Sequence, residues 1–294
     1  MSEPRPPALR RSWLFVPGAD RAALDAAPNS RADVAMQEFE DFTPPARRAE
    51  ARRIAPAILS AWKAAGMVAG VRVNPLWDCG AEDLAAVIPA APHLVMLPKV
   101  SEPDHVVALD RVLTALEARH DLLAGGIEIV PNIESARGLM QTYAIAEASP
   151  RVTTCLVASE DMAADLGAER SHDGIELAHV RARFHLECVA AGVVSIDCPY
   201  TWRDEDGLVA ETQHARRLGY TAKSAVVAGH ARAINRMLTP AADQVAEARR
   251  LTEAFEAARS DGAAGVALDG AMVELPTYLT AKRLLDRAAA FGIA

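Results

Sequence analysis

Acidic side chains follow two consecutive apolar runs in the middle of the chain. Glu134 comes directly after IEIVPNI (127–133), and Asp161 comes shortly after VTTCLVA (152–158). If these runs form neighbouring parallel strands, about 4.8 Å apart, the two carboxylates can share one cation. Hard oxygen ligands completed by water suit Mg²⁺, and also Mn²⁺. Two alternatives stay open: Glu134 caps a helix while Asp161 pairs with a surface arginine, or Glu160 takes the place of Asp161.

A guanidinium and an acidic pair follow two earlier apolar runs. Arg72 lies at the end of VAGVRV (68–73), where its planar donors can hold a carboxylate or an enolate oxygen. Glu40 and Asp41 follow VAMQEF (34–39) and can orient Arg72 or a metal-bound water. Simpler interpretations are a rim salt bridge between Arg72 and Glu40, or acids that favour the first turn of a helix.

Other charged residues near predicted turns carry weaker signals. Arg21 follows a Pro-Gly turn in FVPGADRAAL (15–24), and helix starts with nearby cations bind phosphates readily. Lys99, Asp197 and His230 follow other apolar runs, where a lone Lys or His is more often structural. The chain contains neither GxGxxG nor GxxxxGK[ST], so the sequence does not support a nucleotide-binding loop of either kind.

Eight short apolar runs must position these residues. They are residues 12–16, 34–39, 68–73, 93–97, 127–133, 152–158, 193–196 and 223–227. Stretches of helical period separate them, and this alternation predicts a parallel sheet. Eight such units suit an α/β fold of the closed (β/α)8 type, a TIM barrel, in which the carboxyl ends of the strands form the active face.

Three helices between the runs can be placed from their end signals. Ser101 is predicted to cap a helix that has Pro103 in its first turn. Another helix is predicted to start at Glu134-Ser135. A third is expected over residues 176–191, where Gly192 stops it.

The pattern changes after His230. A helix is predicted over 240–260, then a Gly-rich segment over 260–276 that permits a hairpin-like turn, then a final helix over 277–290. We therefore predict a TIM-barrel catalytic domain over residues 1–235. Residues 236–294 are predicted to form a C-terminal helical extension or lid that carries a mobile flap.

Composition excludes several classes of protein. The chain has 294 residues and a net charge of −8 without a long basic block, so nucleic-acid binding is not expected. Its four cysteines form no CxxC pair, which is typical of reduced thiols in a cytosolic protein. We find no signal peptide and no run of about 18 apolar residues, so we expect no membrane span and a cytoplasmic location.

Assembled in order, these motifs resemble the citrate lyase beta subunit-like branch of the HpcH/HpaI aldolase/citrate lyase family. The resemblance runs from Arg11 to about Ala290. It rests on RSWLFVPGAD (11–20), FEDFTPPARRAEAR (39–52), VRVN (71–74), LPKV (97–100), IEIVPNIESARGL (127–139), ASEDMAADLG (158–167), IDCPYTWRDEDGL (196–208) and LDGAMVELP (268–276). Each motif is unspecific alone, but their order and spacing together are specific.

The resemblance implies a Mg²⁺-dependent carbon–carbon lyase on a TIM barrel, assembled as a homotrimer or hexamer. Such enzymes reversibly cleave a 3-hydroxyacyl-CoA thioester of the malyl-, citramalyl- or citryl-CoA type into an acyl-CoA and an oxo acid. By motif, Glu134 and Asp161 match the metal ligands, and Arg72 matches the arginine that holds the oxo acid or enolate. Glu40 and Asp41 match the acidic pair beneath the metal.

Arg21 and Lys99 match positions near coenzyme A. Three departures from the family pattern bear on the substrate. EFEDFT stands where relatives commonly read DLEDAV, so Phe42 narrows the mouth of the site, and VVAGHARAIN (226–235) replaces an IHP-x-Q stretch. Glu274 stands where the flap of several CoA lyases carries an aspartate that reaches an adjacent subunit.

Two other functions stay open beside the acyl-CoA lyase. One is a metal-dependent class II aldolase acting on free 2-oxo acids, with the same metal and arginine but no coenzyme A pocket. The other is a catalytically silent relative that serves as a subunit or binding partner. The sequence does not decide which acyl-CoA or oxo acid is the substrate.

Overall fold

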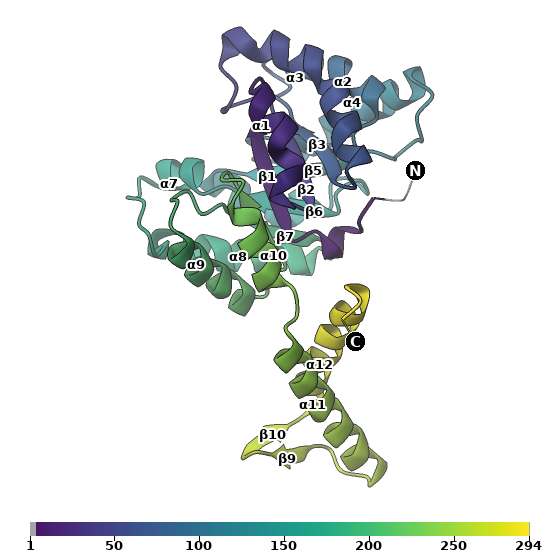
Figure 1. The fold of residues 1–294 in the computed structure, drawn as a ribbon, viewed down its shortest axis with the longest axis vertical. Coiled ribbons are helices and arrows are strands. Elements are labelled where there is room, and N and C mark those ends of the chain that lie inside the picture. Colours follow the sequence, from purple (N-terminus) through teal and green to yellow (C-terminus); the bar gives the residue numbers. More distant parts are fainter. Residues whose placement is uncertain (1–3, 294) are drawn as a thin grey trace. The chain divides into compact units, whose positions relative to one another are not determined.

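A computed structural model describes residues 4–293 of the chain (Figure 1). It divides into two compact units, Met1–Arg236 and Met237–Ala294. Each unit is described by itself below. The assignment of these parts as catalytic domain and lid stays a prediction.

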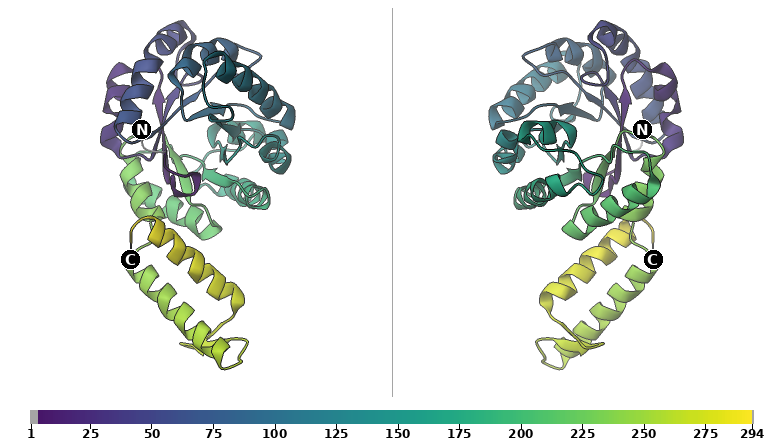
Figure 2. Two further views of the ribbon diagram at one scale, coloured as in Figure 1. Left: turned by 90° about the vertical axis from the view of Figure 1, so that its right-hand side faces the viewer. Right: turned by 90° about the vertical axis from the view of Figure 1, so that its left-hand side faces the viewer.

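The first unit is a closed barrel of eight parallel strands, which confirms the predicted TIM-barrel fold (Figures 1 and 2). The strands follow one another around the barrel in sequence order. They are β1 (Ser12–Pro17), β2 (Val34–Glu38), β3 (Val68–Arg72), β4 (Leu94–Leu97), β5 (Glu128–Ile133), β6 (Thr154–Val157), β7 (Val194–Asp197) and β8 (Ala222–Ala225). At most strand ends, the observed bound differs from the end of the predicted apolar run by one or two residues. One reason is that an apolar run also includes buried residues just outside the strand.

Apolar side chains at alternating strand positions form the core of the barrel. Trp13 and Phe15 on β1, and Leu94 and Met96 on β4, are buried members of one cluster. This spacing of two follows from the pleat, which turns successive side chains to opposite faces. At Gly70 a Cβ atom would lie 2.2 Å from Leu94 Cδ1, so the absence of a side chain there lets Leu94 fill the interior.

Helices surround the strands in the three ribbon views (Figures 1 and 2). They are α1 (Arg21–Ala26), α2 (Arg48–Ala64), α3 (Gly80–Val87), α4 (Pro103–Arg119), α5 (Ala136–Leu139), α6 (Thr142–Ala146), α7 (Glu160–Leu166), α8 (Ala178–Ala190), α9 (Glu205–Leu218) and α10 (His230–Leu238). Short 3-10 turns supplement them, and α10 runs across the boundary between the units. No helix in residues 4–293 is both long enough and apolar enough to cross a membrane.

The predicted helix starts are partly right. Pro103 does open α4, but the predicted cap is wrong, since Glu102 occupies the N-cap position without a side-chain capping bond. Ser135 caps α5, where its hydroxyl accepts a hydrogen bond from the Gly138 N–H at 3.2 Å. The helix predicted there is divided into α5 and α6, because the backbone turns between them.

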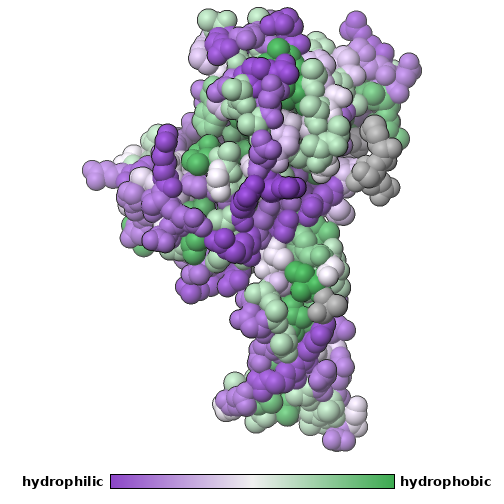
Figure 3. Space-filling model, viewed as in Figure 1, coloured by the Kyte–Doolittle hydropathy of each residue, from purple (hydrophilic) through white to green (hydrophobic). Residues whose placement is uncertain are grey.

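The second unit contains the predicted helix–hairpin–helix. Helix α11 (Ala242–Ser260) packs against α12 (Leu275–Ala290), and β9 (Val266–Leu268) pairs antiparallel with β10 (Ala271–Val273). Asp269 and Gly270 form the two-residue turn with φ of 50° and 80°, the left-handed geometry that matches strand twist in a hairpin. On the face drawn in Figure 3, hydrophilic and hydrophobic residues are interspersed within each unit.

Candidate active site

The last residues of β2 and β3 form the base of the candidate site. Glu38 and Arg72 are register partners on these neighbouring strands, and Arg72 Nε donates to Glu38 Oε1 at 2.8 Å. Glu38 also accepts the backbone N–H groups of Glu40 and Phe42, so its carboxylate fixes both the guanidinium and the loop that follows β2. The sequence analysis did not single out Glu38. The sequence signal that could have identified it is the position of Glu38 inside the apolar run 34–39, because a buried charge needs a partner of opposite charge.

The Arg72 guanidinium lies among further carboxylates. Its Nη1 is 3.5 Å from Glu40 Oε2 and 4.0 Å from Glu134 Oε1, and its Nη2 is 3.9 Å from Asp41 Oδ2. The predicted salt bridge to Glu40 is therefore present, but the closer partner is Glu38. Burial lowers the pKa of Arg72, but the surrounding carboxylates outweigh it and leave the pKa above the ordinary value.

Lys99 joins the same group of acids, two residues beyond β4. Its ammonium contacts Glu40 and lies 3.4 Å from Asp41 Oδ2 and 3.7 Å from Glu134 Oε2. Burial lowers the pKa of Lys99, but the bond to Glu40 and the charges of Glu134 and Asp41 outweigh this effect. The pKa of Lys99 is therefore above its ordinary value, and the group stays charged. The backbone of Lys99 has a φ of 54°, an uncommon value for a residue with a side chain. Glu38, Glu40, Asp41, Arg72, Lys99 and Glu134 are called the Arg72 cluster below.

Glu134 is the least satisfied member of the Arg72 cluster. Its Oε1 accepts a hydrogen bond from Asn132 Nδ2, but within residues 4–293 its Oε2 is buried without a hydrogen-bond partner. Burial raises the pKa of Glu134 to about 7, and the charges of Glu40 and Asp161 add to this against the opposing effect of Arg72 and Lys99. Glu40 Oε2 also lacks a hydrogen bond in the described part of the chain, and burial raises its pKa too.

The structure separates Asp161 from Glu160, which the sequence left open. Both belong to the first turn of α7, just after β6. Glu160 is engaged outside the cluster, where Arg170 Nε lies 3.1 Å and Thr201 Oγ1 2.9 Å from its Oε1. Asp161 instead lines one cavity together with Glu134, and Glu160 is not part of that lining, so of the two acids Asp161 is the one that shares a site with Glu134.

Two cavities meet at this point. The first has a volume of about 260 Å³, and Arg72 and Asp161 are among its lining residues. The second has a volume of about 610 Å³ and is lined by Lys99, Glu134 and Asp161, together with Trp77 and His105. Because Asp161 lines both, the predicted carboxylates and the guanidinium border two adjacent cavities at the carboxyl ends of the strands.

Two predicted site residues lie elsewhere. Arg21 is exposed at the start of α1 and forms an ion pair with Asp25 at 2.7 Å. Glu274 belongs to the second unit, where it precedes α12 without making a side-chain capping bond. The roles predicted for both stay predictions.

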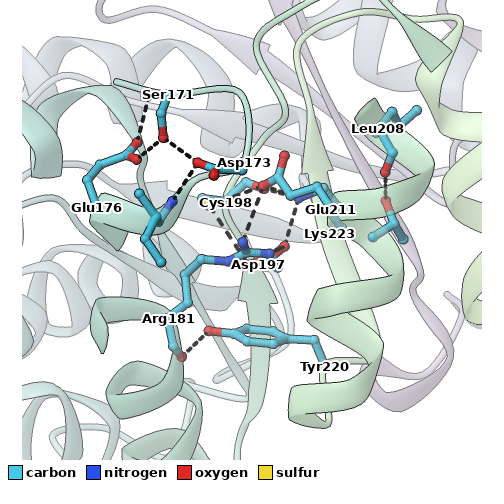
Figure 4. A network of polar contacts seen from close by, with 12 residues as sticks. Ser171, Asp173, Glu176, Arg181, Asp197, Cys198, Leu208, Glu211, Tyr220 and Lys223 are labelled. Atoms are coloured by element: carbon cyan, nitrogen blue, oxygen red, sulfur yellow. Dashed lines mark hydrogen bonds and ion pairs between the residues drawn. The ribbon is translucent and has the colours of Figure 1, made fainter. Parts of the chain in front are cut away.

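A second ionic cluster lies where the last residue of β7, Asp197, pairs with Lys223 of β8 (Figure 4). Asp197 Oδ2 accepts from Arg181 Nη2 at 2.8 Å and from Lys223 Nζ at 2.7 Å. Lys223 Nζ also donates to the Cys198 carbonyl at 2.6 Å and to Glu211 Oε1 at 3.1 Å. Burial alone would raise the pKa of Asp197, but Lys223 and Arg181 hold it below the ordinary value. Arg181, Asp197, Glu211 and Lys223 are called the Asp197 cluster below.

In this second cluster the acidic groups already have their cations. Asp197, Cys198 and Glu211 come close enough together to suggest a metal site. However, the Lys223 ammonium touches a group from each of them, and Asp197 and Lys223 are fully buried. We therefore assign these residues a structural role, which agrees with the weak signal that Asp197 carried in the sequence.

Comparison with known proteins gives similarity along nearly the whole chain. The model of the HpcH/HpaI aldolase/citrate lyase family matches residues 11–228. The citrate lyase subunit beta of Haemophilus influenzae is 32% identical over 282 residues, which cover 95% of this chain and 97% of that protein. The mitochondrial citramalyl-CoA lyase of Mus musculus is 28% identical, with 95% and 86% covered.

Solved structures agree with this result. The CitE protein of Mycobacterium tuberculosis, in complex with magnesium, acetoacetate and coenzyme A, is 26% identical with a TM-score of 0.77, over 96% of this chain and 99% of that one. RipC from Yersinia pestis is 30% identical with a TM-score of 0.67, over 82% and 100%. On the evidence of its barrel, its motifs and these relatives, the chain belongs to the HpcH/HpaI aldolase/citrate lyase family.

Proposed function

We propose that the protein is a Mg²⁺-dependent carbon–carbon lyase. It reversibly cleaves a 3-hydroxyacyl-CoA thioester of the malyl-, citramalyl- or citryl-CoA type into an acyl-CoA and an oxo acid. The observation that carries this proposal is that Glu134 approaches Arg72 and lines one cavity with Asp161, with a buried carboxylate oxygen left without a hydrogen bond. Relatives named citrate lyase subunit beta and citramalyl-CoA lyase support the same reaction class.

The residues present fit a divalent cation. Glu134 Oε2 is buried without a hydrogen-bond partner among the described residues, and the Lys99 ammonium 3.7 Å away is too distant to donate one, so a cation bound there would offset the cost of burial. Glu134 and Asp161 would hold the ion through hard oxygen atoms, which suit Mg²⁺ or Mn²⁺. When bound, the ion would polarise the substrate oxygen next to the bond that breaks. The relative CitE from M. tuberculosis, in complex with magnesium, supports this choice of metal.

Arg72 is proposed to hold the carboxylate of the oxo acid or the enolate oxygen of the acyl-CoA. It lines the first cavity, and Glu38 anchors its Nε, so its remaining donors are oriented before substrate arrives. Donors oriented in advance stabilise charge that develops in the transition state. Glu40 and Asp41 are proposed to orient the guanidinium and metal-bound water from the same side.

In the cleavage direction the bond between C2 and C3 of the thioester breaks. The 3-hydroxyl loses its proton to a base and becomes the keto oxygen of the oxo acid. The electron pair of the bond stays on C2 as the enolate of the acyl-CoA, which then takes up a proton. We propose Glu274 as the group that moves one of these protons, and Arg21 and Lys99 as contacts of the coenzyme A portion.

The test is an assay of the condensation direction. Acetyl-CoA with glyoxylate or pyruvate should give a 3-hydroxyacyl-CoA only when Mg²⁺ is present. Free aldehydes with pyruvate should not react, and reaction there alone would favour the class II aldolase. Full activity in EDTA, or no product from any acyl-CoA or oxo acid, would contradict the proposed lyase.

Variants of neighbouring acids make the assay specific. Glu134→Ala and Asp161→Ala should abolish Mg²⁺-dependent turnover, since both are the proposed ligands. Glu160→Gln is the matched control, because Glu160 precedes Asp161 but bonds to Arg170 and Thr201. Equal losses in all three variants would contradict the assignment of Asp161.

We further propose a homotrimer or hexamer in the cytoplasm, with Glu274 reaching the site of an adjacent subunit. Large apolar side chains near Glu274 support an oligomer, since Met272, Leu275 and Leu279 are 46–62% exposed within the single chain. Light scattering of the purified protein distinguishes a trimer from a hexamer, and a monomer would contradict this part of the proposal.

A further inference from the structure

We infer that the oxo acid accepted here is a 2-oxo monocarboxylate with an apolar side chain, and that Phe42 selects it. This inference rests on the proposed function and names the substrate class of the same site. It means that oxaloacetate, whose side chain is a second carboxylate, is a poor substrate. The 3-hydroxyacyl-CoA would then carry one carboxylate and one hydrocarbon branch at C3.

Aromatic rings flank the group that would bind the first carboxylate. The guanidinium carbon of Arg72 lies 5.4 Å from the ring centroid of Phe15 and 5.4 Å from that of Phe42. An acid held by Arg72 would therefore bind close to both rings. Phe42 is kept in place by its backbone N–H, which donates to Glu38, the same carboxylate that anchors Arg72.

The rest of the first cavity continues this apolar surface. Hydrocarbon side chains come from the interior of the barrel and from the loops above it: Phe15, Phe42, Leu156, Ala158, Pro199 and Val226. The cavity volume of about 260 Å³ is far larger than the hydrogen or methyl side chain of glyoxylate or pyruvate needs. A branch of three or four carbon atoms would replace water against this wall, and each buried CH₂ should raise the affinity about fourfold.

The polar atoms in the lining offer a second carboxylate few donors and no charge. Asn132 donates to Glu134, Thr201 to Glu160 and Ser224 to the Asp197 carbonyl. Ser159 Oγ, buried and without a hydrogen-bond partner in residues 4–293, is one neutral donor.

The charges in the lining also disfavour the binding of a second carboxylate. Arg72 is the one cation among the lining residues that the structure describes, and it is assigned to the first carboxylate. Arg170 touches the lining residue Glu160 but is already paired with Glu160 and Glu176. Lys99 lies beside the lining residue Asp41 but is already surrounded by Glu40, Asp41 and Glu134. A second carboxylate would therefore be desolvated beside Asp41 and Glu160 without a cation of its own, which is strongly unfavourable.

The experiment compares two acids of similar shape and different charge. Oxaloacetate carries a carboxymethyl group, and 4-methyl-2-oxopentanoate carries an isobutyl group in its place. Initial rates of condensation with acetyl-CoA should give a kcat/KM at least about 30-fold higher for 4-methyl-2-oxopentanoate. Titration calorimetry with Mg²⁺ present, without acetyl-CoA, should show the same order of affinity for the two acids.

A substitution at Phe42 tests the selector itself. Phe42→Arg adds a cation to the wall and should raise the ratio of kcat/KM for oxaloacetate over 4-methyl-2-oxopentanoate by tenfold or more. Phe42→Ala should lower kcat/KM for the branched acid about tenfold more than for glyoxylate. The reason is that glyoxylate has no hydrocarbon branch that could contact the Phe42 ring. Leu186→Ala on α8, where the side chain is 69% exposed, is the control and should leave the ratio unchanged.

The outcomes separate this inference from the proposed function. Equal or better use of oxaloacetate by the wild-type protein, or an unchanged ratio in Phe42→Arg, would overturn the inference alone. Uniform loss in Phe42→Ala across all acids would also overturn it, because that result reports only the packing of Phe42 on Arg72. Absence of product from every oxo acid would overturn the proposed lyase, while tighter calorimetric binding of the branched acid would still support the apolar wall.

Discussion

The barrel contains two ionic clusters, one on β2 and β3 and one on β7 and β8, and they differ in how their charges are balanced. In the Asp197 cluster, Asp197 and Glu211 face Arg181 and Lys223, and these acids have short bonds to the cations. In the Arg72 cluster four acids, Glu38, Glu40, Asp41 and Glu134, face Arg72 and Lys99 alone.

The consequences appear in the acids themselves. Cations hold the pKa of Asp197 below its ordinary value, whereas burial raises the pKa of Glu134 to about 7. The Arg72 cluster also borders cavities and keeps buried oxygen atoms without hydrogen bonds in the described residues. A balanced buried cluster stabilises the fold, while an excess of buried acid beside a cavity prepares a site for a cation.

The largest expected difference is in activity. Glu134→Gln should lower kcat by about 10³-fold or more, because it removes a proposed metal ligand worth several kcal/mol. Glu211→Gln, the matched change in the Asp197 cluster, should lower kcat less than about tenfold. Steady-state rates at saturating Mg²⁺ measure both, and similar losses would mean that the two clusters do not differ in function.

The second prediction compares the two lysines. Lys223→Met should lower the free energy of unfolding by about 3–5 kcal/mol, because Asp197 and Glu211 would then face Arg181 alone and a net negative charge would stay buried. Lys99 is 40% exposed, so Lys99→Met should change the free energy of unfolding by less than about 1 kcal/mol. Urea unfolding of both variants in EDTA gives these values. A larger loss in Lys99→Met would show that the Arg72 cluster is the structural one.

The third prediction concerns pH. Between pH 4.5 and 7 the folded, metal-free protein keeps a proton on Glu134 that the unfolded chain has lost. The free energy of unfolding should therefore fall as pH rises through this window, by about 1.4 kcal/mol per pH unit at most, and level off above pH 7. The contribution of Asp197 to the free energy of unfolding depends on pH in the opposite direction. It is present above the ordinary pKa of Asp197 and is lost only as pH falls below that value.

Unfolding curves in EDTA at several pH values test this. Wild-type protein should lose stability relative to Glu134→Gln from pH 5 to pH 7. Parallel pH profiles for the two proteins would contradict the raised pKa of Glu134.

The smallest effect is expected at an ion pair outside both clusters. Arg21 and Asp25 are exposed on α1, so Arg21→Ala should leave Tm unchanged. If Arg21 contacts coenzyme A, KM for the acyl-CoA should rise roughly threefold to tenfold with kcat unchanged. Asp25→Ala is the control for loss of the pair itself, and an equal rise in KM there would argue against a contact with coenzyme A.

Much of the barrel could be predicted because its signals are local. Apolar runs separated by helical stretches, and glycine after α8, are properties of a few adjacent residues. The wrong cap at Ser101 and the division of one helix into α5 and α6 show the limit of such signals, since several neighbouring residues can occupy an N-cap position.

The sequence by itself determined the strand order, the positions of Arg72 and Glu134 at strand ends, and the resemblance to the family. Only the tertiary structure decided that Glu38 anchors Arg72, that Asp161 rather than Glu160 shares a cavity with Glu134, and that Lys99 lies among acids. The physical reason is that the barrel brings together side chains from strands that are far apart in the chain. In addition, at a strand or helix end, an offset of one residue turns a side chain to another face.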